Sequence, residues 1–239
     1  MIALDIDRIH RAFPGRAVEY RASVDSTMHA AAGQPVGAVV LAEEQTAGQG
    51  RHGHSWHSAA GDGVYCSLVL RQSPLLTLAL GLATHSAIFE ATGLVCDLRW
   101  PNDLMLGEKK VAGILVQAAG RNAIAGIGIN VNQTGFPADV ASLATSLRLA
   151  AGRQIGREEI LLALLPAVES IVAQDKGAIL ASFTHLSSYA SGRRVEVHQP
   201  EGILAGTTMG LDPAGFLMVR RDDGTDTLIV AGGVRAARS

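Results

Sequence analysis

The chain has 239 residues, of which 48% are hydrophobic and 18% are charged, and this suits one or two domains with a full core. Its 20 basic and 22 acidic residues leave a formal net charge of −2 at pH 7, which argues against a strongly basic nucleic-acid binder and an acidic tail. Two cysteines cannot form a disulfide scaffold, and the N-terminus lacks the basic start and apolar run of a signal peptide. The most apolar stretch, residues 75–95, contains His85 and Glu90 and is typical of a buried helix rather than a membrane span. We therefore expect a cytoplasmic protein that has no membrane segment.

The predicted elements of the first 190 residues alternate between strands and helices. The first twenty residues should form one helix or strand at the edge, and Asp25 or Ser26 should cap a short helix that ends at residues 33–35. Apolar β-branched runs predict strands, and apolar residues at helical spacing predict helices. The predicted strands are 36–42, 64–70, 95–100, 104–106, 111–118 and 124–131, and the predicted helices are 75–92, 141–150, 158–174 and 178–189.

The pattern of the sequence changes from Ser191 onward. Short strands are expected at 194–198, 202–209, 215–219 and 227–230, with turn signals at 212–215 and 222–224 between them. Short, regularly spaced strands of this kind predict a small β-barrel of about fifty residues. We therefore expect a first domain of residues 1–190 and a second of residues 191–239.

Residues 45–63 form a long glycine-rich segment without apolar periodicity. A loop of this length inside a compact domain is usually functional. Residues 48–53 match G-x-G-x-x-G, but no helical pattern follows, so a dinucleotide-binding turn is disfavoured. The glycines would let backbone amides approach an anion closely, and Arg51 adds a fixed positive charge. The alternative is a flexible surface loop.

Three histidines, His52, His54 and His57, lie in this loop. Their spacing differs from that of a helical zinc site, and no cysteine or carboxylate follows until Asp62. We therefore expect histidines that face the solvent and no metal site.

Polar residues also stand where two other predicted strands begin or end. Pro101 should end a strand and present Asn102 and Asp103 at its end, and Lys110 opens the next apolar strand. Taken alone, the first motif is an ordinary turn and the second a solvated lysine.

Glycines and an asparagine interrupt two apolar strands. Gly113 implies a close approach to the backbone, and Gly126 and Gly128 open space on one face of their strand. Asn130 lies within an apolar run, where its amide needs partners.

These motifs, in their order and spacing, resemble those of the bacterial biotin protein ligases from about residue 20 to the end. The motifs are Ser26-Thr27, Glu44-Gln45-Thr46-Ala47-Gly48-x-Gly50-Arg51-x-Gly53-x-x-Trp56, Arg99-Trp100-Pro101-Asn102-Asp103-Leu104, Lys110-x-Ala112-Gly113-Ile114-Leu115 and Gly126-x-Gly128-Ile129-Asn130. The resemblance implies an α+β fold, in which a mixed β-sheet flanked by helices is followed by a Src-homology-3-like β-barrel.

The resemblance also implies an activity. Biotin protein ligases use ATP, with Mg²⁺, to convert biotin into biotinyl-5′-AMP, and then transfer biotin to one lysine of a biotin carboxyl carrier protein or domain of acetyl-CoA carboxylase. Bringing a carboxylate to a phosphate opposes two anions, so such a site needs cations more than a nucleophilic side chain.

Site residues follow from the same match. Lys110 and Arg51 should act as catalytic cations, and Asp103 should orient Lys110 or the incoming lysine. Biotin should be bound by Ser26, Thr27, Met28, Gln45, Gly48, Gln49, Gly50, Arg51, Lys110, Gly113 and Ile114. ATP and the adenylate should be bound by Arg51, Trp56, Asn102, Lys110 and Asn130, with Trp56 packed over the adenine and Asn130 facing it.

The sequence departs from the family's pattern at two positions. Gln49 stands where the family often has Arg or Lys, and Arg99 stands where Lys is more usual. The first change removes a charge from the loop, and the second keeps one. Some family members carry an N-terminal DNA-binding domain, but only about twenty residues precede the matched region here, so we expect no DNA-binding role. The sequence leaves open whether the chain forms a homodimer.

Two alternative functions remain. A lipoate or octanoate ligase would share the fold class, but its pocket has no ureido group to bind. A non-catalytic small-molecule sensor would not need both Lys110 and Arg51. Exchange of pyrophosphate into ATP in the presence of biotin, lipoate or octanoate distinguishes these three functions.

Overall fold

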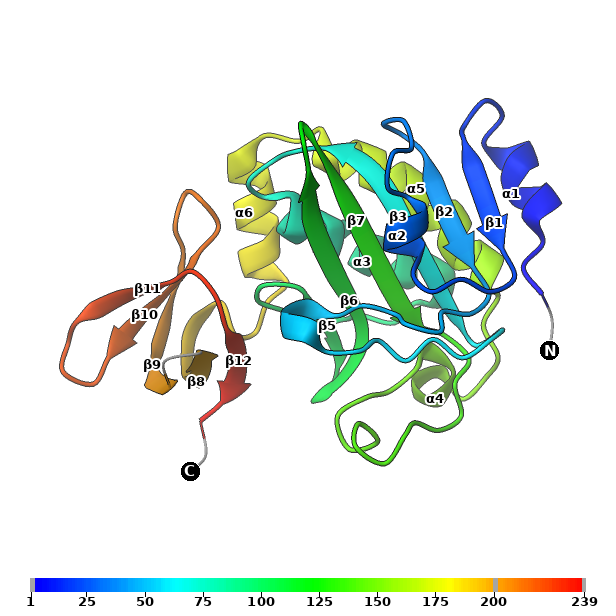
Figure 1. The fold of residues 1–239 in the computed structure, drawn as a ribbon. Helices are drawn as coiled ribbons and strands as arrows, with labels where there is room; N and C mark the ends of the chain where they lie inside the picture. The colour runs from blue at the N-terminus through cyan, green and yellow to red at the C-terminus, as the bar shows by residue number, and fades with distance from the viewer. Residues whose placement is uncertain (1–2, 200–201, 238–239) are drawn as a thin grey trace.

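The computed structural model describes residues 3–199 and 202–237, which build a mixed seven-stranded sheet and a second, five-stranded sheet (Figure 1). The strand order in the larger sheet is β1-β2-β3-β7-β6-β5-β4. Only the β1–β2 pair within it is parallel. Its strands are β1 (Val18–Arg21), β2 (Val39–Ala42), β3 (Gly63–Arg71), β4 (Asp97–Arg99), β5 (Asp103–Leu106), β6 (Lys109–Ala119) and β7 (Asn122–Asn130). The α+β class and the mixed sheet are therefore confirmed.

Two long helices, α3 (Leu76–Thr92) and α5 (Arg157–Val172), pack together behind the sheet as Figure 1 is drawn. Leucine and alanine recur on all sides of the first half of α3, so that half is buried almost all round, as expected for a helix segment in the core. Gly93 ends it in the left-handed conformation, with φ of 76°. The remaining helices are α1 (Ile6–Ala12), α2 (Thr27–Ala30), α4 (Leu147–Ala151) and α6 (Lys176–His185).

The helix predicted at residues 141–150 is wrong in its first half, because α4 begins only at Leu147. The preceding backbone pairs with Lys110 instead: the Lys110 N–H donates to the Leu143 carbonyl at 2.8 Å, and the Thr145 N–H donates to the Lys110 carbonyl at 2.9 Å. Ser146 then caps α4 by accepting the Leu149 N–H. A non-local pairing thus replaces the helix that local composition favours.

The N-terminal twenty residues form both a helix and a strand, α1 and β1, and not one element as predicted. Asp5 caps α1, and the parallel pairing of β1 with β2 places this segment at the edge of the sheet. Ser26, rather than Asp25, caps α2.

The five-stranded sheet is antiparallel, with strand order β11-β10-β9-β8-β12. Its strands are β8 (Ser191–Gln199), β9 (Gly202–Leu211), β10 (Leu217–Arg221), β11 (Asp226–Ile229) and β12 (Gly233–Ala236). The sequence predicted four of these strands and missed β12, which pairs with the distant β8.

The two sheets meet at a packed seam. The Trp100 indole donates to the Gly215 carbonyl at 2.9 Å, and Gly215 lies against the side chains of Leu75 and Leu78 on the α3 side. Buried residues of the smaller sheet, such as Val195, belong to the same hydrophobic cluster as α3. Within the described residues, no helix is long and apolar enough to cross a membrane.

Candidate functional site

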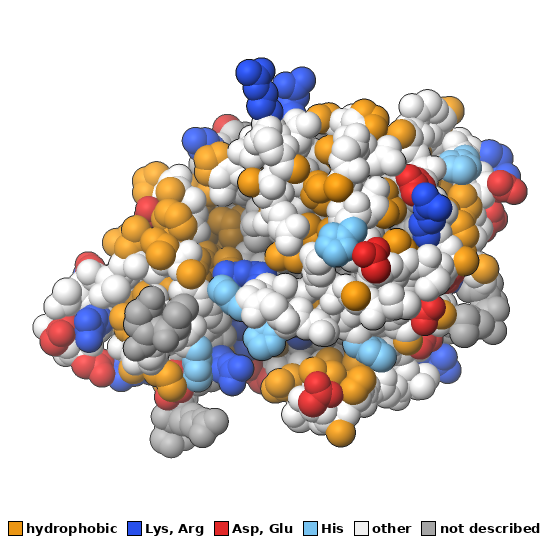
Figure 2. Space-filling model, in the orientation of Figure 1, with side chains coloured by type: hydrophobic (Ala, Val, Ile, Leu, Met, Phe, Trp, Pro, Cys, Tyr) orange, Lys and Arg blue, Asp and Glu red, His pale blue; other side chains and the backbone are white. Residues whose placement is uncertain are grey.

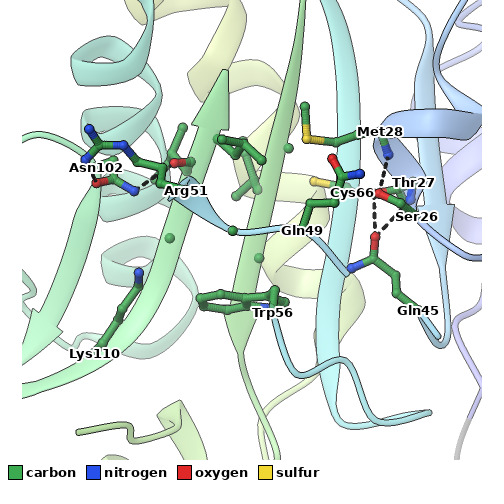
Figure 3. Close-up of a pocket in the computed structure, with 17 residues that line it drawn as sticks. Ser26, Thr27, Met28, Gln45, Gln49, Arg51, Trp56, Cys66, Asn102 and Lys110 are labelled. Carbon is green, nitrogen blue, oxygen red and sulfur yellow. Dashed lines mark hydrogen bonds between the residues drawn. The ribbon is translucent and has the colours of Figure 1, made fainter. Parts of the chain in front are cut away.

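A small pocket lies on the face of the large sheet opposite α3, beneath α2 and the glycine-rich loop (Figure 3). Its cavity has a volume of about 40 Å³. Figure 2 shows basic and histidine side chains gathered near the hollow between this face and the smaller sheet. The lining residues are Ser26, Thr27, Met28, Gln45, Gln49, Gly50, Arg51, Trp56, Cys66, Asn102, Lys110, Gly113, Ile114, Leu115, Gly126, Ile127 and Gly128.

One end of the pocket is a network of buried hydroxyls and an amide. The Thr27 N–H and hydroxyl both donate to Gln45 Oε1, at 2.9 and 3.1 Å. Because the Thr27 hydroxyl has one hydrogen, the Ser67 hydroxyl donates to Thr27 Oγ1 at 2.8 Å. Gln45 Nε2 donates to Ser58 Oγ at 2.8 Å. Together with Ser26 at the start of α2, this end can offer both donors and acceptors to a small polar ring.

The other end of the pocket carries two cations. Lys110 Nζ lies 2.6 Å from Asp103 Oδ1 and 5.3 Å from the centre of the Trp56 ring. Arg51 donates to Asn102 Oδ1 at 2.9 Å. Burial lowers the pKa of Arg51 from its ordinary value, and the Asp103 carboxylate opposes that shift. A guanidinium remains charged under these conditions, so two fixed positive charges face the same cavity.

The indole of Trp56 lies across glycines of the central strands. A Cβ atom at Gly128 would stand 2.5 Å from the indole, and one at Gly113 would stand 3.1 Å from it. Gly126 is covered by Met28 in the same way, at 2.9 Å from its sulfur. The space that the glycines open is thus filled by these two side chains. Trp56 Nε1 is buried and has no hydrogen-bond partner among the described residues.

The glycine-rich loop is held by its own backbone and by a buried ion pair. The Trp56 N–H donates to the Gly48 carbonyl at 2.8 Å, and a Cβ at Gly48 would come within 2.5 Å of the Trp56 carbonyl oxygen. Arg157 donates to Glu43, just before the loop, at 2.7 Å and to the Gly63 carbonyl, at its end, at 3.3 Å. The two ends of the loop are therefore fixed together.

The three loop histidines are exposed, as the sequence predicted. His52 and its neighbours Arg51 and Gly53 form one turn of 3₁₀ helix. In the part of the chain that the structure describes, no group of three or more His, Cys, Asp or Glu side chains could hold a metal ion.

Twelve of the predicted site residues line the pocket together, and three do not: Gly48, Asp103 and Asn130. Gly48 shapes the loop, and Asp103 pairs with Lys110 from outside the lining. Asn130 is buried and donates to the Thr145 carbonyl at 3.0 Å. Since Thr145 pairs with the Lys110 backbone, Asn130 supports the segment beside Lys110 rather than lining the cavity.

The predicted set missed several pocket residues, namely Cys66, Leu115, Gly126, Ile127 and Gly128. The alternating glycines of β7 had indicated open space but were not assigned to a ligand. Cys66 is fully buried, and burial raises the pKa of its thiol to about 12, so this thiol is inert near neutral pH. Ser67 was also missed, although a serine within an apolar strand signals a buried hydroxyl that needs a partner.

Comparison with known proteins identifies the family. Residues 20–133 match the model of the biotin/lipoate A/B protein ligase family. The chain is 35% identical over 223 residues to the bifunctional ligase/repressor BirA of Bacillus subtilis, covering 84% of this chain and 68% of that protein. It is 32% identical over 225 residues to the biotin–[acetyl-CoA-carboxylase] ligase of Mycobacterium tuberculosis, covering 88% and 83%.

A solved structure agrees with these sequence relatives. The biotin protein ligase from Aquifex aeolicus, in complex with biotin and ATP, superposes with a TM-score of 0.83 and 31% identity, covering 93% of this chain and 99% of that one. The mixed sheet and its pocket, together with these matches, place the chain in the class of biotin and lipoate ligases. It belongs to the biotin/lipoate A/B protein ligase family and, within it, to the biotin protein ligases.

Proposed function

We propose that this protein activates biotin with ATP and transfers it to a lysine of a biotin carboxyl carrier protein or domain, as in acetyl-CoA carboxylase. The observation that carries this proposal is a single pocket with a hydroxyl and amide network at one end and the Lys110 and Arg51 cations at the other. Such a pocket suits a ligand whose polar ring and carboxylate are separated by an apolar tail. The Mycobacterium tuberculosis relative is a biotin–[acetyl-CoA-carboxylase] ligase, and the Aquifex aeolicus biotin protein ligase structure holds biotin and ATP.

The reaction has two balanced steps. A carboxylate oxygen of biotin attacks the α-phosphorus of ATP, the bond to the bridging oxygen breaks, and pyrophosphate leaves. The acceptor lysine amine then attacks the acyl carbon of biotinyl-5′-AMP, its bond to the AMP oxygen breaks, and the nitrogen loses a proton as the amide forms. Both steps gather negative charge on phosphate oxygens, so positioned cations accelerate them.

The polar end of the pocket is assigned to the biotin ring. Ser26, Thr27 and Gln45 provide hydroxyl and amide groups for the ureido N–H and carbonyl. The hydroxyl of Ser67 fixes the direction in which the Thr27 hydroxyl points its hydrogen. Met28 packs beside them over Gly126. This arrangement favours biotin over lipoate or octanoate, which have no ureido group to pair with buried polar atoms.

The remaining predicted residues are assigned to the tail, the carboxylate and the nucleotide. Gly113 and Ile114 line the apolar tail, and the loop residues Gly48, Gln49 and Gly50 surround the carboxylate. Lys110, oriented by Asp103, and Arg51, oriented by Asn102, lie against the carboxylate and the α-phosphate.

The nucleotide needs further contacts. Trp56 packs over the adenine, and its unpartnered Nε1 gives the indole a free donor. Asn130 acts on the nucleotide indirectly, because it supports the Thr145 segment that pairs with Lys110.

Mg²⁺ enters with ATP rather than through a site made by the protein. The Asp103 carboxylate is already paired with Lys110, and Mg²⁺ is commonly bound through nucleotide phosphates with few protein ligands. Bound there, the ion would neutralise charge on the leaving pyrophosphate.

Ligand entry requires the loop to open. A cavity of about 40 Å³ has room for a few water molecules, whereas sites for ligands of drug size span roughly 300–1,000 Å³. The indole of Trp56 occupies the surface of Gly113 and Gly128, so it must move aside to expose the strands. In its new position it lies over the adenine, and the space that it leaves gives the adenylate room when the loop closes again.

Several features of the wider molecule belong to the same proposal. We assign residues 1–190 to a catalytic domain and residues 191–239 to a Src-homology-3-like barrel, supported by the antiparallel five-stranded sheet that starts at Ser191. We place the protein in the cytoplasm, and we assign it no DNA-binding role because its net charge is −2.

The proposal is tested by pyrophosphate exchange. The purified protein is incubated with ATP, Mg²⁺ and labelled pyrophosphate, together with biotin, lipoate or octanoate. We expect label to enter ATP only with biotin. Exchange that depends on lipoate or octanoate instead, or no exchange with any of the three acids, would contradict the assignment.

A further inference from the structure

The side chain of Gln49 is held from two sides. Its Nε2 lies 2.7 Å from His29 Nε2 on α2, and its Oε1 accepts from Gln117 Nε2 on β6 at 3.4 Å. His29 Nδ1 in turn lies 2.7 Å from Asp25 Oδ2. These four residues, Asp25, His29, Gln49 and Gln117, form one chain of hydrogen bonds, which we call the Gln49 bridge.

The proton positions in the Gln49 bridge are mutually consistent. The Asp25 carboxylate can only accept, so a neutral His29 ring carries its hydrogen on Nδ1. Its Nε2 is then an acceptor, which matches the Nε2 donor of Gln49. The Gln49 oxygen is left to accept from Gln117. Each side chain therefore meets a complementary partner.

The Gln49 bridge lies over the pocket. Gln49 is the one member that lines the cavity, and it belongs to the glycine-rich loop. Figure 3 places it between Arg51 and the α2 residues Ser26 and Met28. His29 and Gln117 flank the pocket from α2 and from β6, so the bridge fastens the loop to both sides. The other Asp25 oxygen accepts the Ser26 N–H at 2.6 Å, which ties the bridge to the polar end of the pocket.

We propose that the Gln49 bridge holds the glycine-rich loop closed and thereby keeps biotinyl-5′-AMP in the pocket until the acceptor lysine attacks it. This inference rests on the proposed function and identifies the residues that retain the adenylate at that same site. His29 and Gln117 are positioning residues, because they act through Gln49 and do not line the cavity. Neutral hydrogen bonds thus take the place of the cation that resembling sequences often carry at position 49.

The first test needs no substrate. Hydrogen–deuterium exchange is followed in peptides covering residues 48–57 of the wild-type protein and of His29→Ala. Loss of a neutral hydrogen bond of about 1 kcal/mol should raise loop opening, and hence exchange, about fivefold. Gln117→Ala should have a smaller effect, because its 3.4 Å contact is long. Unchanged loop exchange in His29→Ala would overturn the inference, whether or not the protein proves to use biotin.

His54→Ala is the matched control. His54 is an exposed histidine of the same loop, and its side chain makes no hydrogen bond within the described residues. This variant should exchange like wild type. If loop exchange rose as much in His54→Ala as in His29→Ala, the effect would not be specific to the Gln49 bridge, and the inference would be overturned.

The second test measures retention. Preformed biotinyl-5′-AMP is chased with excess unlabelled biotin and ATP, and its release is timed. His29→Ala and Gln49→Ala should each release it about fivefold faster. In His29→Ala, whose side chain does not line the cavity, biotin-dependent pyrophosphate exchange should stay close to wild type. The double variant, His29→Ala with Gln49→Ala, should release the adenylate no faster than the faster single variant, because both substitutions remove the same hydrogen bond between His29 and Gln49. Additive effects, or release at the wild-type rate, would contradict the inference. Absence of exchange in the wild type would instead refute the proposed function.

Discussion

Replacement of Lys110 by alanine is the most informative single change in the cation pair. Its ammonium lies 2.6 Å from Asp103 and near the face of Trp56, at the end of the pocket assigned to the carboxylate and phosphate. Removing one preorganised donor of this kind typically lowers a rate by about 10²–10³, or roughly 2.7–4 kcal/mol. We therefore expect Lys110→Ala to lose biotin-dependent pyrophosphate exchange by about that factor.

The fold should survive this substitution. The side chains of Lys110 and Asp103 are 31% and 32% exposed, so solvent screens the pair, and losing it should cost at most about 1 kcal/mol of stability. Circular dichroism and urea unfolding check this in parallel. Lys109→Ala is the matched control, because Lys109 is the exposed neighbour on the same strand. Exchange near the wild-type rate in a folded Lys110→Ala protein would refute the catalytic role.

Three further substitutions or treatments probe other parts of the site. Arg51→Gly should still form biotinyl-5′-AMP but release it, so that lysines of bystander proteins become biotinylated; bystander labelling at the wild-type level would contradict this. Gly128→Ala should displace the Trp56 ring, which lies 2.5 Å from the new Cβ position, and should change tryptophan fluorescence and weaken ATP binding; an unaltered spectrum would count against it. Because burial raises the pKa of the Cys66 thiol to about 12, little thiolate exists at pH 8, and iodoacetamide should label Cys66 only slowly until the pH approaches that value. Rapid labelling of the folded protein at pH 8 would show that the pocket wall is open.

The elements that the sequence predicted correctly are those that local rules determine. The helix α3 could be predicted at residues 75–92 because its apolar residues recur at helical spacing and Gly93 can end it in the left-handed conformation. The hairpin of β5 and β6 could be predicted because Gly107 stands at its turn. Such signals lie within a few residues of each other, so composition and spacing are enough to find them.

The elements that sequence reasoning missed depend on distant partners. Residues 141–146 have the composition of a helix, yet their backbone pairs with Lys110, more than thirty residues earlier. β12 is a strand because it pairs with β8, the first strand of the same sheet, which lies more than thirty residues earlier in the sequence. No local pattern contains either partner, so neither outcome could be predicted without the fold.

The candidate site shows the same division. Its lining could be predicted at twelve positions because the motifs resemble a known family. The hydrogen bonds that hold the lining residues in place could not be predicted. The hydrogen bond from Ser67 to Thr27 joins residues 40 apart in the sequence, and the contact of His29 with Gln49 joins residues 20 apart. Asn130 was predicted to face the adenine, but its buried amide donates to the Thr145 carbonyl and supports the Lys110 segment. Roles that pass through a neighbour become visible only in three dimensions.

The most direct test of biotin ligase activity is transfer to an acceptor. The purified protein is incubated with biotin, ATP, Mg²⁺ and the carrier domain of a biotin-dependent carboxylase, and the intact mass of the carrier is measured. We predict a gain of one biotinyl group on the target lysine, dependent on ATP and abolished when that lysine is replaced by arginine. A carrier whose mass stays unchanged, or that gains a lipoyl or octanoyl group when those acids are supplied in place of biotin, would contradict this activity.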